Sequence, residues 1–401
     1  MSKLYPLKGK VQHYAWGGEA YIPNLLNIRA ENPPYAEYWL GAHVNAPSVL
    51  KSENGEQNLD NFIETNIDST LGQSIAARFG RLPFLFKVLD VKDMLSIQVH
   101  PTKVEAEKGF ARENEMGIPL NAPNRNYKDD NHKPEIMVAL SEFWLLHGFL
   151  PEVDLKAVLN QVPELSYLLK NFENGGYFEL YKKVMEQSDE ERNQVLRPLI
   201  DRILPLYKAG QLDKANPDYW AAKAVDSAED RSVLDRGIYS IYFFNIVRAE
   251  PGQAVFQDAG IPHAYLEGQN MELMANSDNV LRGGLTPKHV DVAELLKHVI
   301  FEETHPNIMH GELQPDGLER IYKSPAPDFE LSKIDLKSSD RYLSRASTAQ
   351  ILIVLEGEAE VTEGQKKVVL KKGESAFITS NCDYEVISPA PTTTMYKATA
   401  P

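Results

Sequence analysis

Strand-type apolar patterns at both ends of the chain enclose a helix-type region, and few folds accommodate that order. Short apolar runs broken by Gly, Pro and Asn occupy the first ~150 residues. A short helix is expected within 102–114, and the polar loop at 117–131 is longer than idle loops usually are. The predicted strands of this region lie at 82–90, 94–100, 136–140 and 143–149.

Residues 152–225 have a different pattern, in which apolar side chains recur at the three- and four-residue spacing of an amphipathic helix. Ser188 and Glu191 match a capping box, so a helix should begin there. The sequence therefore predicts a helical insertion between two strand-rich regions. The fold class expected is mainly β with an α-helical insertion.

Strand patterns return at 240–250 and fill the last ~85 residues. One further helix is expected at 290–300, opened by Thr286 as cap and Pro287 in the first turn. A faint internal repeat aligns 251–265 with 371–385 and sets His263 against Tyr384. This repeat predicts two related β-barrels, of which the second lacks a metal-ligating residue that the first has.

Length and charge exclude several classes of protein. A chain of 401 residues exceeds what one hydrophobic core usually supports, so two or three domains are expected. The net charge of −15 disfavours binding to nucleic acid or to anionic lipid. No apolar run is long enough to span a membrane, and the first residues lack the apolar core of a signal peptide. With a single cysteine, Cys382, these features favour the cytoplasm.

The segment at 96–101, SIQVHP, predicts a strand with polar side chains on one face. Side chains alternate along a strand, so Ser96, Gln98 and His100 share one side, and Ile97 and Val99 share the other. Taken alone, this pattern also describes a half-buried strand whose polar side faces solvent.

Two further segments supply metal-ligating side chains. Glu135 ends a polar run just after Pro134, and His263 follows a Gly-Ile-Pro turn into a strand. A lone buried histidine is more often a satisfied core residue than a ligand. Two imidazoles, one carboxylate and the amide oxygen of Gln98, however, form a nitrogen and oxygen set that suits zinc, with manganese, iron or nickel as alternatives. Gln98 is the weakest member because amide ligands are unusual for zinc.

An anionic substrate would require basic side chains against the overall negative charge. Lys87, Lys133, Arg282 and Lys288 are available, and each alone is readily explained as a solvated charge. Lys87 is the exception, because it interrupts an apolar strand. A buried charge there costs free energy unless it has a functional role.

At this point the chain resembles the type I mannose-6-phosphate isomerases along essentially its whole length. Residues 127–135, YKDDNHKPE, match the pattern Y-x-D-x-N-H-K-P-E, and 263–288 match the second signature of the family without a gap. Gly18 stands where many members have Ser, and we assign that position no role. Similar segments are HYAWGG (13–18), AEYWLGAH (36–43), LPFLFKVLD (82–90) and SIQVHP (96–101).

The resemblance implies an aldose–ketose isomerase that interconverts mannose 6-phosphate and fructose 6-phosphate through a cis-enediol. It implies a cupin-type β-barrel (jelly-roll) catalytic domain, a helical domain and a C-terminal cupin-like barrel without metal. In this chain the expected boundaries are 1–150 plus 236–310 for the catalytic domain, 151–235 for the helical insertion and 311–401 for the C-terminal domain.

The resemblance also assigns site residues. One Zn²⁺ per chain is expected, and the active-site arginine matches Arg282. Moving a proton between C1 and C2 requires a base and an anion anchor. The zinc ligands fall on Gln98, His100, Glu135 and His263. Candidates for proton transfer are Lys133, Asp278, His132 and Glu272, and candidates for phosphate binding are Ser96 and Lys87, with Lys288 in reserve.

The sequence is also compatible with two other classes of protein. One is a non-catalytic cupin that binds a metal and a sugar phosphate, which loss of Arg282 or of a metal ligand would indicate. The other is an iron-dependent dioxygenase, which Lys87 and Arg282 argue against. The expected partner is a small sugar phosphate rather than nucleic acid or membrane, and a cytoplasmic monomer is expected.

Overall fold

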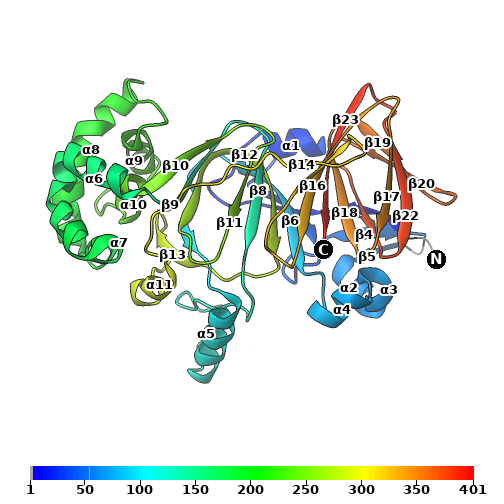
Figure 1. Ribbon diagram of the computed structural model, residues 1–401, viewed down its shortest axis with the longest axis horizontal. Helices are drawn as coiled ribbons and strands as arrows, with labels where there is room; N and C mark the ends of the chain where they lie inside the picture. Colours follow the sequence, from blue (N-terminus) through cyan, green and yellow to red (C-terminus); the bar gives the residue numbers. More distant parts are fainter. Residues whose placement is uncertain (1–2, 54, 229) are drawn as a thin grey trace.

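The computed structural model describes residues 3–53, 55–228 and 230–401. Three parts follow one another along its long axis: a group of helices, a central β-barrel and a second set of strands that contains the C-terminus (Figure 1). The predicted fold class, mainly β with an α-helical insertion, is confirmed. In the described parts of the chain, no helix combines the length and apolar content that crossing a membrane requires.

One long strand, β12 (His263–Ala275), organises the central barrel. Different stretches of it pair antiparallel with four other strands, so residues far apart in the sequence meet along its length. Its partners are β6 (Phe84–Val91), β7 (Ile97–Val99), β8 (Glu135–Ala139) and β9 (Phe143–Phe149). These strands confirm the predictions at 82–90, 136–140 and 143–149, whereas at 94–100 only Ile97–Val99 forms a strand. The barrel is completed by β2 (Lys10–Gln12), β3 (Glu37–Gly41), β10 (Phe244–Ala249), β11 (Ala254–Gln257) and β13 (Leu281–Gly284).

The strand prediction at 240–250 was wrong at its start. Residues Gly237–Phe243 form helix α10, and only the following β10 is a strand. Every residue of α10 is buried, so its sequence is apolar on all sides. Periodicity does not distinguish a buried helix from a buried strand in such a run.

The helical insertion consists of α6 (Glu152–Gln161), α7 (Leu169–Met185), α8 (Asp189–Lys208), α9 (Pro217–Asp226) and α10. The predicted capping box is confirmed at the start of α8, where the Ser188 hydroxyl accepts from Glu191 N and the Glu191 carboxylate accepts from Ser188 N. The short helix expected within 102–114 is α5 (Lys103–Glu115), capped by Thr102.

The predicted start of the helix at 290–300 was wrong. This helix, α11 (Val292–His298), begins after Asp291, whose side chain accepts from Glu294 N. Thr286 lies instead in the loop before it, because the Asp235 carboxylate accepts from the backbone N–H groups of Leu285 and Thr286. Leu285 also has a positive φ of 54°, which a helix does not allow.

The C-terminal part forms a nine-stranded and a four-stranded sheet, and it also recruits the beginning of the chain. Strand β1 (Leu4–Lys8) pairs with β21 (Ser375–Ile378) and with β4 (Val49–Ser52), which pairs with β5 (Gly55–Asn58). The expected catalytic range 1–150 therefore contributes strands to both β regions. Sheet pairing is a long-range property, and local apolar patterns do not encode it.

Apolar side chains from both β regions pack into one shared core. Phe84 and Phe86 of β6 belong to the same buried cluster as Ile351 and Phe377 from the C-terminal strands. Burial of each such side chain stabilises the fold by roughly 1.5–3 kcal/mol. The shared core joins the two barrels, while the charged residues of the central barrel gather elsewhere in its interior.

Candidate metal centre

Three buried side chains converge inside the central barrel. His100 follows β7, Glu135 opens β8 and His263 opens β12. His100 Nε2 lies 3.4 Å from Glu135 Oε1, and His263 Nε2 lies 3.4 Å from Glu135 Oε2. One donor atom from each of the three residues lies within 4.8 Å of the others, which is close enough for one metal ion to contact all three.

The hydrogen bonds of both imidazoles leave the same nitrogen available. His100 Nδ1 lies 2.9 Å from the Asn279 carbonyl oxygen, and His263 Nδ1 lies 2.9 Å from the Ile261 carbonyl oxygen. A carbonyl only accepts, so each Nδ1 carries the proton and each Nε2 presents a lone pair. Among the described residues, neither buried Nε2 atom has a hydrogen-bond partner, and a metal ion would satisfy both.

The protonation states also suit a cation. Burial lowers the pKa of His100 to about 4, which keeps the imidazole neutral. Burial by itself would raise the pKa of Glu135, but Lys133 and the imidazoles outweigh it and hold that pKa well below its usual range. The neutral imidazole of His100 beside the ionised carboxylate of Glu135 belongs to a donor set that fits Zn²⁺.

Gln98 stands next to this cluster in the middle of β7. It is half-buried, and its backbone is the register partner of His263 on one side and of Arg282 on the other. The strand prediction for SIQVHP is borne out, with Ile97 and Val99 fully buried on the opposite face.

A cavity opens beside the cluster, and its walls are polar and charged. The Lys87 ammonium lies 2.9 Å from Glu272 Oε2 and 3.4 Å from Glu37 Oε2. Lys133 Nζ lies 3.0 Å from Glu135 Oε1. The residues lining the cavity are Glu37, Lys87, Leu89, Leu95, Gln98, Lys133, Glu135, His263, Ala264, Tyr265 and Glu272.

Two carboxylates of this cavity differ in their affinity for a proton. Burial raises the pKa of Glu272, and the charges of Glu135 and Glu37 act in the same direction, although Lys87 opposes them. The pKa of Glu135 moves in the opposite direction. Neighbouring acids whose pKa values are driven apart are typical of sites where one holds a proton and the other stays charged.

A cationic group lies next to the cluster on β13. In the described residues, no carboxylate pairs with the Arg282 guanidinium, and burial lowers the pKa of Arg282. Burial, followed by the charge of Arg282, lowers the pKa of Lys288, so these two cations lie near each other. Unpaired, partly buried cations form a site for an anion.

The remaining predicted residues lie around the centre. Asp278 Oδ1 is 3.3 Å from His43 Nε2, and Ser96 is half-buried immediately before β7. His132 Nε2 is 2.8 Å from the Asp328 carboxylate, and His132 is not one of the residues that line the cavity. The structure thus joins His132 to the C-terminal part, although His132 and Lys133 are neighbours in the sequence.

Two buried residues near the metal cluster were not predicted. His147 is the register partner of His263, and Gln257 is the register partner of Glu135, so both face the barrel interior. His147 Nδ1 lies 2.7 Å from Gln257 Oε1, while Gln257 Nε2 is buried without a partner. Their sequences, WLLHGF and AVFQDA, carry no polar pattern that would have singled them out.

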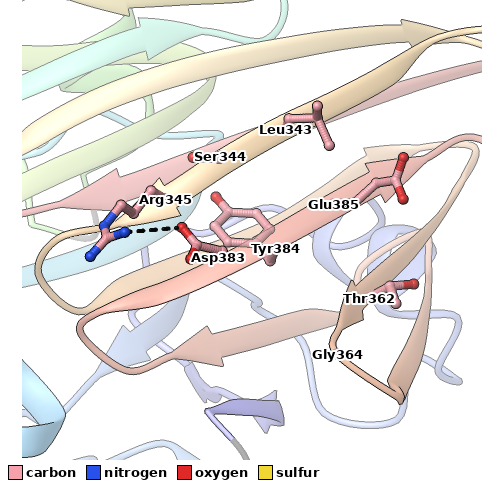
Figure 2. Close-up of a pocket in the computed structure, with 8 residues that line it drawn as sticks. All are labelled: Leu343, Ser344, Arg345, Thr362, Gly364, Asp383, Tyr384 and Glu385. Carbon is pink, nitrogen blue, oxygen red and sulfur yellow. Dashed lines mark ion pairs between the residues drawn. The ribbon is translucent and has the colours of Figure 1, made fainter.

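A shallow depression lies on the C-terminal part of the molecule, far along the chain from this centre (Figure 2). Two of its charged side chains, Arg345 and Asp383, are exposed and pair with each other, with Arg345 Nη1 3.6 Å from Asp383 Oδ1, and the third, Glu385, pairs with Arg341 outside the depression. It contains no histidine, so it offers no second metal cluster of the kind found in the central barrel.

Comparison with known proteins places this centre in a family. The mannose-6-phosphate isomerase of Escherichia coli is 38% identical over 386 residues, which cover 94% of this chain and 95% of that protein. The chain belongs to the type I phosphomannose isomerase family. The model of the type I phosphomannose isomerase catalytic domain matches residues 4–152, and that of the mannose-6-phosphate isomerase cupin domain matches residues 319–387.

Other phosphomannose isomerases agree in sequence and in fold. The human mannose-6-phosphate isomerase is 32% identical, with 94% of each chain covered. The solved apo form from Salmonella typhimurium aligns with a TM-score of 0.88 and 34% identity over 100% of both chains. A zinc-bound mannose 6-phosphate isomerase aligns equally well, with a TM-score of 0.88, 35% identity and 98% and 99% of the chains covered. The cupin fold expected from the sequence is thereby confirmed.

Proposed function

We propose that this phosphomannose isomerase interconverts mannose 6-phosphate and fructose 6-phosphate with the help of one zinc ion. The observation that carries the proposal is the buried cluster of His100, Glu135 and His263, which adjoins a charged cavity. Arg282 lies opposite Gln98 in the strand register, and no carboxylate pairs with it among the described residues. A metal cluster, a proton-carrying acid and an anion anchor are the parts that this isomerisation requires.

We propose that the zinc ion is held by His100, Glu135, His263 and Gln98. A zinc ion held there would supply positive charge against the negative charge that develops on the sugar oxygens during the reaction. Gln98 is included because it lines the same cavity as Glu135 and lies beside His263 in the strand register. The solved relative described as zinc-bound supports this choice of metal.

Proton transfer is proposed for Glu272 and Lys133, which both line the cavity. Burial raises the pKa of Glu272, which makes its carboxylate a stronger base, so the carboxylate is suited to take a proton from C2 and, once protonated, to return it to C1. Lys133 donates toward Glu135 and keeps that carboxylate charged. Asp278 and His132 are less suited, since each is engaged outside the cavity, with His43 and Asp328 respectively.

Phosphate binding is proposed for Arg282 and Lys288, with the Ser96 hydroxyl as a further donor. The two cations are close enough to lower the pKa of Lys288, and a phosphate dianion would relieve that repulsion. Lys87 has a different role in this proposal. Its charge is balanced by Glu272 and Glu37, so it positions the Glu272 carboxylate rather than holding an external anion.

The oligomeric state and the cellular compartment of the protein are also proposals. We infer a monomer that acts on a soluble sugar phosphate. We also infer the cytoplasm, because the one cysteine is buried and free, which suits a reducing compartment. Arg282 and Lys288 would attract the phosphate dianion locally, although the overall charge of the protein, −15, repels anions.

A coupled assay that follows fructose 6-phosphate formation from mannose 6-phosphate tests the function. We expect turnover in the zinc-loaded enzyme, its loss after chelation, and its recovery when Zn²⁺ is returned. Turnover that survives complete removal of metal would disprove the metal role. A zinc-loaded protein that binds mannose 6-phosphate without converting it would instead favour the non-catalytic cupin.

Replacing Arg282 separates substrate chemistry from metal binding. Arg282→Ala should lose about 10²- to 10³-fold in kcat/KM, because it removes a cation proposed to hold the substrate phosphate, while its zinc content stays at one per chain. Arg248→Ala, which removes an exposed arginine paired with Glu142 and Glu250, is the matched control and should keep full activity. Loss of zinc from Arg282→Ala would show that the residue is structural.

A further inference from the structure

Asn279 is completely buried between the segments that carry the metal ligands. Its side-chain oxygen accepts from the backbone N–H groups of Lys128 at 2.7 Å and Asp129 at 3.3 Å. Its side-chain nitrogen donates to the carbonyl oxygens of Asp129 and Asn131, both at 2.8 Å. One amide therefore binds the loop at 128–131 through both of its ends, and few other side chains have this combination of donors and acceptors.

The backbone of the same residue orients a metal ligand. The Asn279 carbonyl oxygen lies 2.9 Å from His100 Nδ1 and fixes the proton on that nitrogen. The lone pair of His100 Nε2 is thereby directed toward Glu135. Contacts of this kind fix both the tautomer and the ring orientation of metal-binding histidines.

The loop that Asn279 binds leads directly to the second ligand. Only the short segment after Asn131 separates it from Lys133 and Glu135. Asp129 strengthens the junction, because its carboxylate accepts from the Ser277 hydroxyl at 2.8 Å and from Asp278 N at 2.8 Å. Asn279 thus connects the ligand on β7 with the ligand on β8 through hydrogen bonds that do not involve the metal.

We propose that Asn279 is a positioning residue of the metal centre: its carbonyl sets the direction of His100 Nε2, and its side-chain amide fixes the loop that delivers Glu135. The cluster is then preorganised for metal rather than assembled by it. This inference rests on the proposed zinc site and adds to it a residue that contacts neither metal nor substrate.

The test is the affinity of the purified, metal-free full-length protein for Zn²⁺, measured by competition with a chelator. Asn279→Asp keeps the size of the side chain and the oxygen that accepts from Lys128 and Asp129. It replaces the donating nitrogen with an oxygen that repels the carbonyls of Asp129 and Asn131. We expect the Kd for Zn²⁺ to rise about 10- to 100-fold, with a changed absorption spectrum when Co²⁺ is bound instead.

Asn245→Asp is the matched control. Asn245 also donates through its side chain to several backbone carbonyls, those of residues 147–149 and Thr304, but it binds no segment that holds a metal ligand at its end. Both variants should have a lower Tm. Only Asn279→Asp should lose metal affinity in the folded state, at a temperature where both proteins are fully folded.

Equal Zn²⁺ affinity in Asn279→Asp and Asn245→Asp would overturn the proposal and leave Asn279 a purely structural residue. If Asn279→Asp does not fold, Asp129→Asn replaces it and should weaken Zn²⁺ binding in the same direction; unchanged affinity there would equally overturn the proposal. Failure of the unmodified protein to bind Zn²⁺ would be a different result, because it would reject the metal centre itself.

Discussion

Both barrels of this phosphomannose isomerase contain buried charges, but they neutralise these charges in different ways. In the C-terminal barrel, Lys397 Nζ lies 2.6 Å from Glu319 Oε1, and the Tyr342 hydroxyl contacts both groups at 2.9 Å. In the central barrel, Glu135 contacts Lys133 and two imidazoles, and those imidazoles still have buried nitrogens without partners.

The difference shows why, among the residues that the structure describes, the candidate metal cluster lies in the central barrel. The ammonium of Lys397 occupies the centre of its cluster, so the Glu319 carboxylate already has a cation. At the position that the internal repeat aligns with His263, the C-terminal barrel has Tyr384, whose hydroxyl donates to Gln350. A buried carboxylate that already contacts an ammonium stabilises the fold, whereas buried imidazole nitrogens without a hydrogen-bond partner are available to a ligand.

The largest expected effect comes from removing a ligand of the central barrel. His100→Ala should lose bound zinc and reduce kcat/KM by about 10³-fold or more, because several kcal/mol of charge stabilisation depend on the metal. Elemental analysis measures the zinc content, and the coupled assay measures kcat/KM. Tyr384→His, which adds an imidazole to the C-terminal barrel, should bind no second zinc ion. One tightly held zinc per chain in His100→Ala would remove this residue from the ligand set.

The next effect compares the two buried lysines. Lys87→Met leaves Glu272 and Glu37 without their cation, and Lys397→Met leaves Glu319 without its own. Each should lower the free energy of unfolding by about 3–5 kcal/mol, since each leaves a buried carboxylate uncompensated. Urea denaturation measures this loss.

Activity distinguishes the same two variants. At a temperature where both are folded, Lys87→Met should have a much lower kcat, while Lys397→Met should turn over as fast as the unmodified enzyme. The double change Lys397→Met with Glu319→Gln should recover part of the stability. Equal loss of kcat in both single variants would show that the two barrels do not differ in function as we describe.

The smallest effect is a dependence of stability on pH that originates in the central barrel. Burial lowers the pKa of His147 to about 4, compared with about 6.5 when the chain is unfolded. As the pH falls below about 6.5, the unfolded chain binds a proton that the folded protein does not, so stability decreases until about pH 4. His147 should account for roughly 1–3 kcal/mol of this loss.

His147→Gln in the metal-free protein should therefore lose less stability between pH 6.5 and pH 4 than the unmodified protein does. Denaturation curves at several pH values measure the slope. His305→Gln, at an exposed position, is the control and should leave the slope unchanged. An identical slope for His147→Gln and the unmodified protein would mean that His147 does not drive the acid sensitivity.

Much of the candidate site was predictable because it lies in short, dense motifs. Glu135 with Lys133, and His100 with Gln98, were identified from local patterns that the structure confirms as strand starts and strand ends. His147 and Gln257 could not be found in this way. Their importance comes from strand register, which places them opposite His263 and Glu135 across the barrel.

The sequence by itself determined the β–α–β order and the resemblance to the family, and it predicted the candidate metal ligands, because strand and helix periodicities and contiguous motifs are local properties. The tertiary structure alone decided which side chains meet. It paired the first strand with the C-terminal sheet, turned His132 toward Asp328, and enclosed Lys87 between two carboxylates. It also gave Asn279 its connections, since hydrogen bonds between distant segments depend on how the strands are brought together.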